Sequence, residues 1–136
     1  AIDFSLKDMN GNTISLESLE GNIVLLNFWA TWCAPCRQEM PSMQNLYDTY
    51  KNDNFILLAV NLRDSKEQVR QFIEKEGYTF PVLLDTEGSV GGTYGVSGIP
   101  TTYLIDSAGE ILGRIVGSIE WDTPQIKDTI ETLLES

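Results

Sequence analysis

The sequence contains no histidine, and Cys33 and Cys36 are the only cysteines among its 136 residues. Without histidine, the chain cannot use Ser-His-Asp or Cys-His catalysis, nor an imidazole metal ligand. Two cysteines are too few for a disulfide scaffold. Any general acid or base must therefore be a carboxylate, a lysine, a tyrosine or a thiol, and we expect no metal site and no cofactor.

Basic residues are also scarce. Nine lysines and arginines against twenty aspartates and glutamates leave a net charge of -11. Nucleic-acid binding needs a basic surface that displaces counterions from phosphates, so we expect no nucleic-acid partner. No stretch approaches the roughly 18 consecutive apolar residues of a membrane span, and the first residues lack a signal-peptide profile. Because the chain starts at Ala1 rather than Met, we expect that an N-terminal leader or anchor is missing from it.

What is present suits one ordinary globular domain over residues 1–136, since 42% of the residues are hydrophobic and 21% are charged. Asn10-Gly11 between two short runs predicts an opening hairpin, and the apolar run 23–29 predicts a strand buried on both faces. A helix is expected next, at about 34–50. The other expected elements are strand 55–62, a helix capped by Ser65 and ending near Gly77, strand 80–84, at most a frayed helix within 85–96, a hairpin of strands 101–105 and 111–116, and a helix capped by Thr123. This order predicts an α/β fold with a central mixed sheet flanked by helices.

The pair Cys33-Ala34-Pro35-Cys36 lies between the expected strand and helix. A Cys-x-x-Cys pair can be half of a zinc site, a structural disulfide or a redox-active dithiol. The zinc interpretation is weak because too few ligands are present, and a disulfide that closes so short a loop stabilises little. The redox interpretation is therefore favoured.

The position of the dithiol predicts different roles for its two thiols. Cys33 would lie at the helix N-terminus, where unpaired N–H groups and the helix dipole stabilise an anion and lower the thiol pKa. We expect Cys33 to be the attacking thiolate. Cys36, one turn further in and more buried, would resolve the mixed disulfide.

Trp32-Cys33-Ala34-Pro35-Cys36, followed by Gly98-Ile99-Pro100-Thr101-Thr102 before a strand, resembles the thioredoxin fold and in detail its TlpA/ResA-like branch. The resemblance covers nearly the whole chain, including the leading hairpin and a strand and helix inserted between Ser65 and Leu84. It implies that Pro100 is a cis proline lying against the dithiol and that the Ile99 backbone pairs with an extended substrate. Trp32 and Pro35 are expected to contribute to the substrate surface, with Trp32 covering the dithiol and excluding water.

Glu39 follows Cys36 by three residues, on the same helix face and about one turn away. Typical thioredoxins carry a buried aspartate where this chain has Asn27, so the usual proton acceptor is absent. Spacing alone leaves open whether Glu39 is an ordinary solvated carboxylate or the replacement base. The resemblance implies the second, because the TlpA/ResA-like branch has a glutamate here that tunes the thiol pKa values.

The resemblance further implies a thiol-disulfide oxidoreductase that reduces disulfides in other proteins outside the bacterial cytoplasmic membrane. Apocytochrome c is one substrate that it suggests, and an upstream dithiol, membrane-bound, would supply the electrons. Two alternatives remain. One is a peroxidase of the peroxiredoxin type, although that chemistry normally uses an isolated cysteine. The other is a non-catalytic thioredoxin-like module that only binds a partner.

Overall fold

The apolar run Ile23–Trp29 forms β3, the central strand, and all seven of its residues are buried. A computed structural model, which describes residues 1–136, pairs β3 in parallel with β4 (Phe55–Leu62) and antiparallel with β6 (Thr101–Ile105). A strand with neighbours on both sides and cover on both faces has no solvent-facing positions, which explains its nearly continuous hydrophobicity.

The sheet has seven strands in the order β2-β1-β5-β4-β3-β6-β7. Its remaining strands are β1 (Ser5–Asp8), β2 (Thr13–Ser15), β5 (Val82–Asp85) and β7 (Ile111–Val116). β3, β4 and β5 are mutually parallel, whereas all other pairs are antiparallel. The predicted mixed sheet is confirmed. β5 begins two residues later than expected, at Val82.

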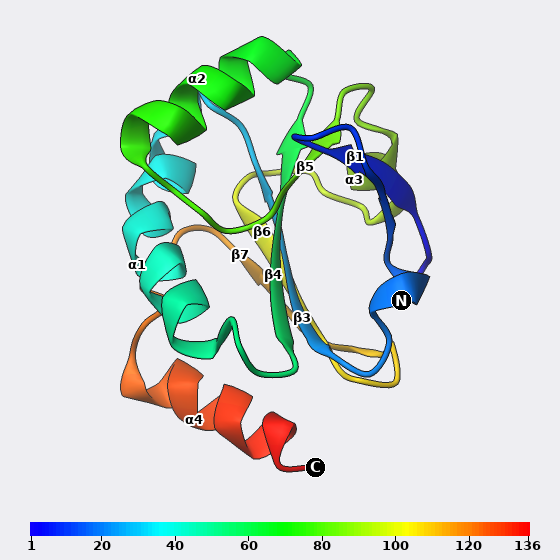
Figure 1. Ribbon diagram of the computed structural model, residues 1–136, viewed down its shortest axis with the longest axis vertical. Helices are drawn as coiled ribbons and strands as arrows, with labels where there is room; N and C mark the ends of the chain where they lie inside the picture. Colours follow the sequence, from blue (N-terminus) through cyan, green and yellow to red (C-terminus); the bar gives the residue numbers. More distant parts are fainter.

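Helices cover both faces of the sheet (Figure 1). One face carries α1 (Ala34–Tyr50), α2 (Lys66–Glu76) and α4 (Pro124–Leu134). The other face carries the short α3 (Ser89–Thr93) and the 3-10 turn η1 (Glu17–Leu19). No helix combines the length and the apolar character that crossing a bilayer requires.

Alternation along β3 divides the core into two clusters. Leu25 and Trp29 belong to the cluster beneath α1, and Leu26 and Phe28 to the cluster on the opposite face. Successive side chains of a strand point to opposite faces, so Asn27 points toward α1. Asn27, the one polar residue of β3, thus faces α1, the helix that begins at the dithiol.

Local signals position the helices as predicted. Ser65 and Gln68 form the expected capping box at the start of α2, and Gly77 ends that helix with φ +76°. Thr123 caps α4, where its Oγ1 accepts a hydrogen bond from the N–H of Ile126 at 3.4 Å. The glycine-rich stretch, where at most a frayed helix was expected, forms the five-residue helix α3.

Candidate active site

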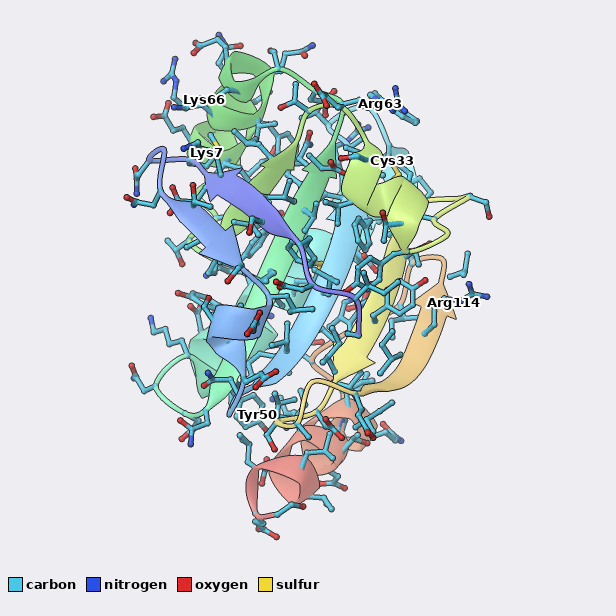
Figure 2. The ribbon with its side chains drawn as sticks, turned by 90° about the vertical axis from the view of Figure 1, so that its right-hand side faces the viewer. Lys7, Cys33, Tyr50, Arg63, Lys66 and Arg114 are labelled. Atoms are coloured by element: carbon cyan, nitrogen blue, oxygen red, sulfur yellow. A yellow bond between two sulfur atoms is a disulfide. The ribbon has the colours of Figure 1, made fainter.

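Cys33 is the N-cap residue of α1, and it forms a disulfide with Cys36 in this structure. Its Sγ accepts a hydrogen bond from the N–H of Cys36 at 3.2 Å. Both cysteines are buried, since Cys33 is 5% exposed and Cys36 is 1% exposed. The helix N-terminus would stabilise negative charge on Cys33 in the reduced form. Figure 2 shows Cys33 at one end of the molecule, far from Tyr50 at the other end of α1.

The peptide bond between Ile99 and Pro100 is cis, which confirms the expectation from the family resemblance. The carbonyl oxygen of Ile99 lies 3.7 Å from Sγ of Cys33. Pro100 is buried, and its own carbonyl accepts a hydrogen bond from the N–H of Gly117 at 2.8 Å. The backbone before β6 therefore lies against the dithiol, although 66 residues separate it from Cys33.

The loop that carries Trp32 is anchored from both sides. The N–H of Thr31 donates to Oδ2 of Asp64 at 2.7 Å, and Nη1 of Arg37 donates to the Thr31 carbonyl at 2.7 Å. Asp64 also accepts from Nδ2 of Asn61 at 2.9 Å. Sequence reasoning missed Asp64, whose signal is a carboxylate directly after β4, the parallel neighbour of β3.

Trp32 is 69% exposed, so most of this residue faces solvent, and its covering of the dithiol stays a prediction. It lines an open groove of about 270 Å³ together with Ile99 and five other residues. Pro35 occupies the first turn of α1, where its missing N–H costs no helical hydrogen bond. The residues expected at the substrate surface, Trp32, Pro35, Ile99 and Pro100, thus gather around Cys33 from two separate segments.

Glu39 is 1% exposed, which excludes the ordinary solvated carboxylate. Its Oε1 accepts from Nδ2 of Asn27 at 2.9 Å. Its Oε2 accepts from Nε1 of Trp121 at 3.0 Å and from the N–H of Ile119 at 3.2 Å. Three donors from two segments of the chain, β3 and residues 119–121, therefore hold one carboxylate one helical turn beyond Cys36.

Burial and hydrogen bonding act in opposite directions on this carboxylate. Loss of water around Glu39 raises its pKa, while the hydrogen bonds from Trp121, Ile119 and Asn27 lower it, and the net pKa lies above the ordinary value of 4.5. A carboxylate with a raised pKa is a better proton acceptor near neutral pH. The environment of Glu39 thus suits proton transfer.

Asn27 links Glu39 to the strand that follows the cis proline. Its Nδ2 donates both to Glu39 and to Oγ1 of Thr102, each at 2.9 Å, whereas its Oδ1 has no hydrogen-bond partner. Thr102 is the register partner of Asn27 and lies two residues after Pro100. The Asn27 amide therefore connects, through its two hydrogen bonds, the Glu39 carboxylate with the strand that follows the cis proline.

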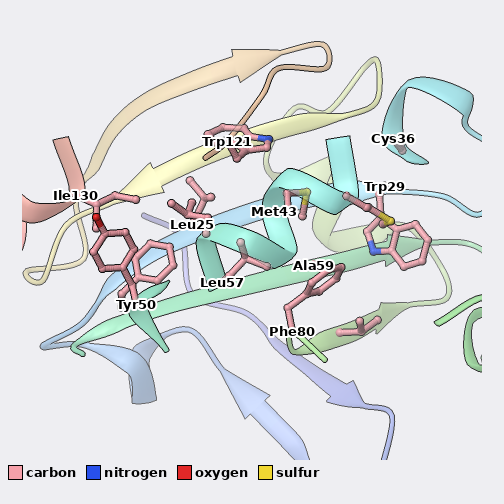
Figure 3. Packing of buried hydrophobic residues seen from close by; sticks show 14 of the residues in the cluster. Leu25, Trp29, Cys36, Met43, Tyr50, Leu57, Ala59, Phe80, Trp121 and Ile130 are labelled. Atoms are coloured by element: carbon pink, nitrogen blue, oxygen red, sulfur yellow. The ribbon is translucent and has the colours of Figure 1, made fainter. Parts of the chain in front are cut away.

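Trp121 is a site residue that sequence reasoning missed. It is 2% exposed, and it binds Glu39 across a separation of 82 residues. Figure 3 shows Trp121 in the same buried layer as Met43 and Cys36. Ser42 fixes the Trp121 backbone, because its Oγ accepts the Trp121 N–H at 2.9 Å. No periodicity or motif in the sequence marks this indole as a partner of Glu39.

A protein-family model described as the AhpC/TSA family matches residues 1–113. The chain belongs to the AhpC/TSA family. It is also 43% identical over 136 residues to the thiol-disulfide oxidoreductase ResA of Geobacillus kaustophilus, an alignment that covers 100% of this chain and 75% of that relative.

Two solved structures are similar over nearly their whole length. A Chlorobium tepidum protein assigned as a thiol:disulfide interchange protein DsbE is 36% identical, with a TM-score of 0.89 and coverage of 98% of this chain and 94% of the other. StoA from Bacillus subtilis is 32% identical, with a TM-score of 0.79 and coverage of 96% and 95%. The expected thioredoxin-like fold and the resemblance to ResA are confirmed. With Cys33 and Cys36 as its CxxC pair, the protein is a thiol-disulfide oxidoreductase.

Proposed function

We propose that the protein reduces disulfides in other proteins outside the bacterial cytoplasmic membrane. In this proposal Cys33 is the nucleophile, Cys36 is the resolving thiol and Glu39 is the proton acceptor. The observation that carries the assignment is the environment of Glu39: a buried carboxylate with a raised pKa, held one turn beyond Cys36 by three donors.

The reaction begins with the reduced dithiol. The Cys33 thiolate attacks one sulfur of the substrate disulfide, a new S–S bond forms, and the other substrate sulfur leaves as a thiolate that takes up a proton. Cys36 then transfers its proton to Glu39 and attacks Sγ of Cys33. The second substrate sulfur leaves and is protonated, so two electrons and two protons have passed to the substrate.

The substrate would bind across Cys33. The Ile99 carbonyl, 3.7 Å from the Cys33 sulfur, is placed to accept a hydrogen bond from an extended segment beside the disulfide. Pro100 holds this backbone against the dithiol, while Trp32 and Pro35 present apolar surface next to it. The substrate is therefore recognised by backbone geometry and by side chains that flank its cysteine.

A second dithiol must restore the reduced state after each turnover, because the reaction leaves Cys33 and Cys36 oxidised. We propose a membrane-bound dithiol as this donor and apocytochrome c as one substrate, in line with the resemblance to ResA. The disulfide form of this structure is the form that such a donor would reduce.

The substrate is identified by trapping the mixed disulfide. Cys36→Ala removes the resolving thiol, so a substrate attacked by Cys33 should remain covalently attached and be recovered by non-reducing electrophoresis and mass spectrometry. An oxidised peptide with an apocytochrome-type Cys-x-x-Cys-His sequence serves as the first probe. Cys33→Ala is the matched control, and trapping by Cys33→Ala instead of Cys36→Ala would contradict the assignment.

The peroxidase alternative is tested with the same preparation. Reduced protein should release two thiols per peptide disulfide and should not accelerate the loss of hydrogen peroxide. Peroxide consumption that depends on Cys33, without any peptide reduction, would favour the peroxidase. Partner binding that survives replacement of both cysteines by serine, without any reductase activity in the parent protein, would favour a binding module.

A further inference from the structure

Arg63 is a cation without an ion-pair partner beside the dithiol of a protein whose net charge is -11. The three ion pairs in the structure join Lys51 to Asp48 and Arg70 to Glu67 and Glu74. The Arg63 side chain is exposed and makes no hydrogen bond to another residue. In Figure 2, Arg63 lies at the same end of the molecule as Cys33.

The backbone holds Arg63 in an unusual conformation. Its φ is +66°, and no other residue except glycine has a positive φ. This left-handed region is disfavoured for residues with a side chain. Here the N–H of Arg63 donates to the carbonyl of Asp85 at 3.1 Å, which ties the turn after β4 to the end of β5.

Gly88 provides the space for the Arg63 side chain. A Cβ atom at Gly88 would lie 2.5 Å from Nε of Arg63, so a residue with a side chain there would displace the guanidinium. The backbone turn at Arg63 therefore directs its guanidinium over Gly88, where the absence of a side chain leaves room for it. Arg63 is also one of the residues that line the groove that contains Trp32 and Ile99.

The groove lies beside the dithiol, because Ile99, one of its lining residues, has its carbonyl oxygen 3.7 Å from Sγ of Cys33. It measures about 270 Å³ and is lined by Trp32, Leu62, Arg63, Val96, Ser97, Gly98 and Ile99. A space of this kind next to an attacked disulfide would receive the side chain of a residue that neighbours the substrate cysteine. Its lining combines apolar walls with one free cation.

Arg63 forms no ion pair with a neighbouring carboxylate. The adjacent carboxylate, Asp64, is buried and accepts from Thr31 and Asn61. Arg37, the other arginine near the dithiol, donates to the Thr31 carbonyl and so already has a partner. Arg63 is therefore the cation of this rim that is available to a ligand.

We propose that this groove is a substrate subsite and that Arg63 selects an acidic side chain next to the substrate cysteine that Cys33 attacks. A guanidinium can donate two parallel hydrogen bonds to a carboxylate, which gives both attraction and orientation. The subsite rests on the proposed function, since it orients a disulfide that Cys33 reduces. The occupant is an Asp or Glu of an extended disulfide-containing protein segment.

Because the whole protein is negatively charged, we expect an acidic substrate residue to speed the reaction only when it lies close to Arg63. Acidic substrates are repelled at long range, but salt screens such repulsion beyond about 8 Å at physiological ionic strength. An acidic residue should help only where Arg63 can reach it. The same residue placed at the far end of a peptide should slow the reaction.

The test uses single-turnover reduction of three disulfide-cyclised peptides that differ at one position. Asp stands beside the attacked cysteine in the first, Asn stands there in the second, and the third has Asn there and Asp at its far end. The wild-type protein should reduce the first about two- to fivefold faster than the second at low ionic strength, which is the range of an exposed ion pair. High salt should diminish the difference.

Substitutions then assign the preference to one residue. Arg63→Gln should abolish the Asp-over-Asn preference, and Arg63→Lys should retain part of it. Arg114→Gln on β7 makes the same change in net charge at another exposed arginine and should keep the full preference.

The rate for the Asn peptide separates the two proposals. If the wild-type protein reduces neither peptide, the proposed function fails. If it reduces both at equal rates, or if Arg63→Gln retains the full preference, the subsite proposal is overturned while the reductase function stands.

Discussion

Glu39 and Asp85 are two carboxylates that are each only 1% exposed, but their partners differ. Asp85 accepts hydrogen bonds from the N–H groups of Val90 at 3.3 Å and Gly91 at 2.9 Å, five and six residues away. The donors to Glu39 lie 12, 80 and 82 residues away. Asp85 thus closes a local loop at the start of α3, whereas Glu39 joins three distant segments beside a dithiol.

This difference shows that burial alone does not mark a functional carboxylate. Asp85 satisfies backbone donors that would otherwise be unpaired, which is a sufficient structural reason for a buried acid. Glu39 receives two of its hydrogen bonds from side chains, and desolvation raises its pKa. We therefore expect substitutions of Asp85 to change stability and substitutions of Glu39 to change reactivity.

The largest effect is expected for Asp85→Ala. It leaves the buried N–H groups of Val90 and Gly91 without an acceptor, and each such loss costs about 1–3 kcal/mol, so the free energy of unfolding should fall by about 2–6 kcal/mol. Urea denaturation measures the change. Asp128→Ala, at an exposed carboxylate on α4, is the control and should change stability by less than about 0.5 kcal/mol. Equal changes in the free energy of unfolding for Asp85→Ala and Asp128→Ala would contradict a structural role for Asp85.

Glu39→Gln should lower the rate of disulfide reduction about 100-fold and shift its pH profile, because a positioned proton acceptor contributes at least about that factor. The fold should survive. The Asn27 amide can rotate so that its unpaired Oδ1 accepts from the new Gln amide, and the Thr102 hydroxyl can donate or accept. Stopped-flow reduction of an oxidised peptide, beside circular dichroism, measures both quantities.

The control for that substitution is Glu76→Gln at the exposed end of α2, which makes the same chemical change away from the dithiol. It should leave the rate and the pH profile as they are. A Glu39→Gln protein with a normal rate and profile would contradict the proposed base.

Trp121→Phe should move the pH midpoint of the reaction upward by about one to two units. The substitution removes the indole N–H that donates to Oε2 of Glu39 at 3.0 Å, and hydrogen bonds to the charged form lower a carboxyl pKa. A hydrogen bond to a charged group is worth about 1.5–3 kcal/mol, which sets the size of the shift. The shift should disappear in the double variant with Glu39→Gln. Its persistence there would show that Trp121 acts through another group.

The smallest expected effect is the pH dependence of the free energy of unfolding. The pKa of Glu39 is raised in the folded state, so between the ordinary value of 4.5 and the folded pKa the folded protein binds more protons than the unfolded chain. Stability contributed by neutral Glu39 is full below this window and is lost as pH rises through it, with a slope of at most about 1.4 kcal/mol per pH unit. Urea unfolding of the wild type and Glu39→Gln at a series of pH values measures this. The free energy of unfolding of the wild type minus that of Glu39→Gln should fall with rising pH in this window. A difference that stays constant with pH would contradict the raised pKa of Glu39.

Much of the fold followed from local patterns. The apolar run of β3, the capping box at Ser65 and the stop at Gly77 depend on residues close in sequence, and each appears where it was expected. The glycines in the stretch after β5 predicted at most a frayed helix, and the five-residue α3 lies there. Its start is held by the side chain of Asp85 rather than by a residue of high helix propensity.

The active site was predicted only in part. Cys33, Cys36 and Glu39 share the first turns of one helix, so their spacing already placed them together. Pro100 was placed by resemblance. Asp64, Trp121 and Arg63 carry no such signal, since they reach the dithiol region through the pairing of β3 with β4 and through the return of the chain after β7.

The sequence by itself determined the reactive group and its position. It placed a dithiol at the start of a helix and a carboxylate one turn further on, in a chain without histidine. Only the tertiary structure decided that this carboxylate is buried and held by Asn27, Ile119 and Trp121. The physical reason is that helical spacing specifies neighbours within one turn. Desolvation and hydrogen bonds across 80 residues exist only once the sheet has brought those segments together.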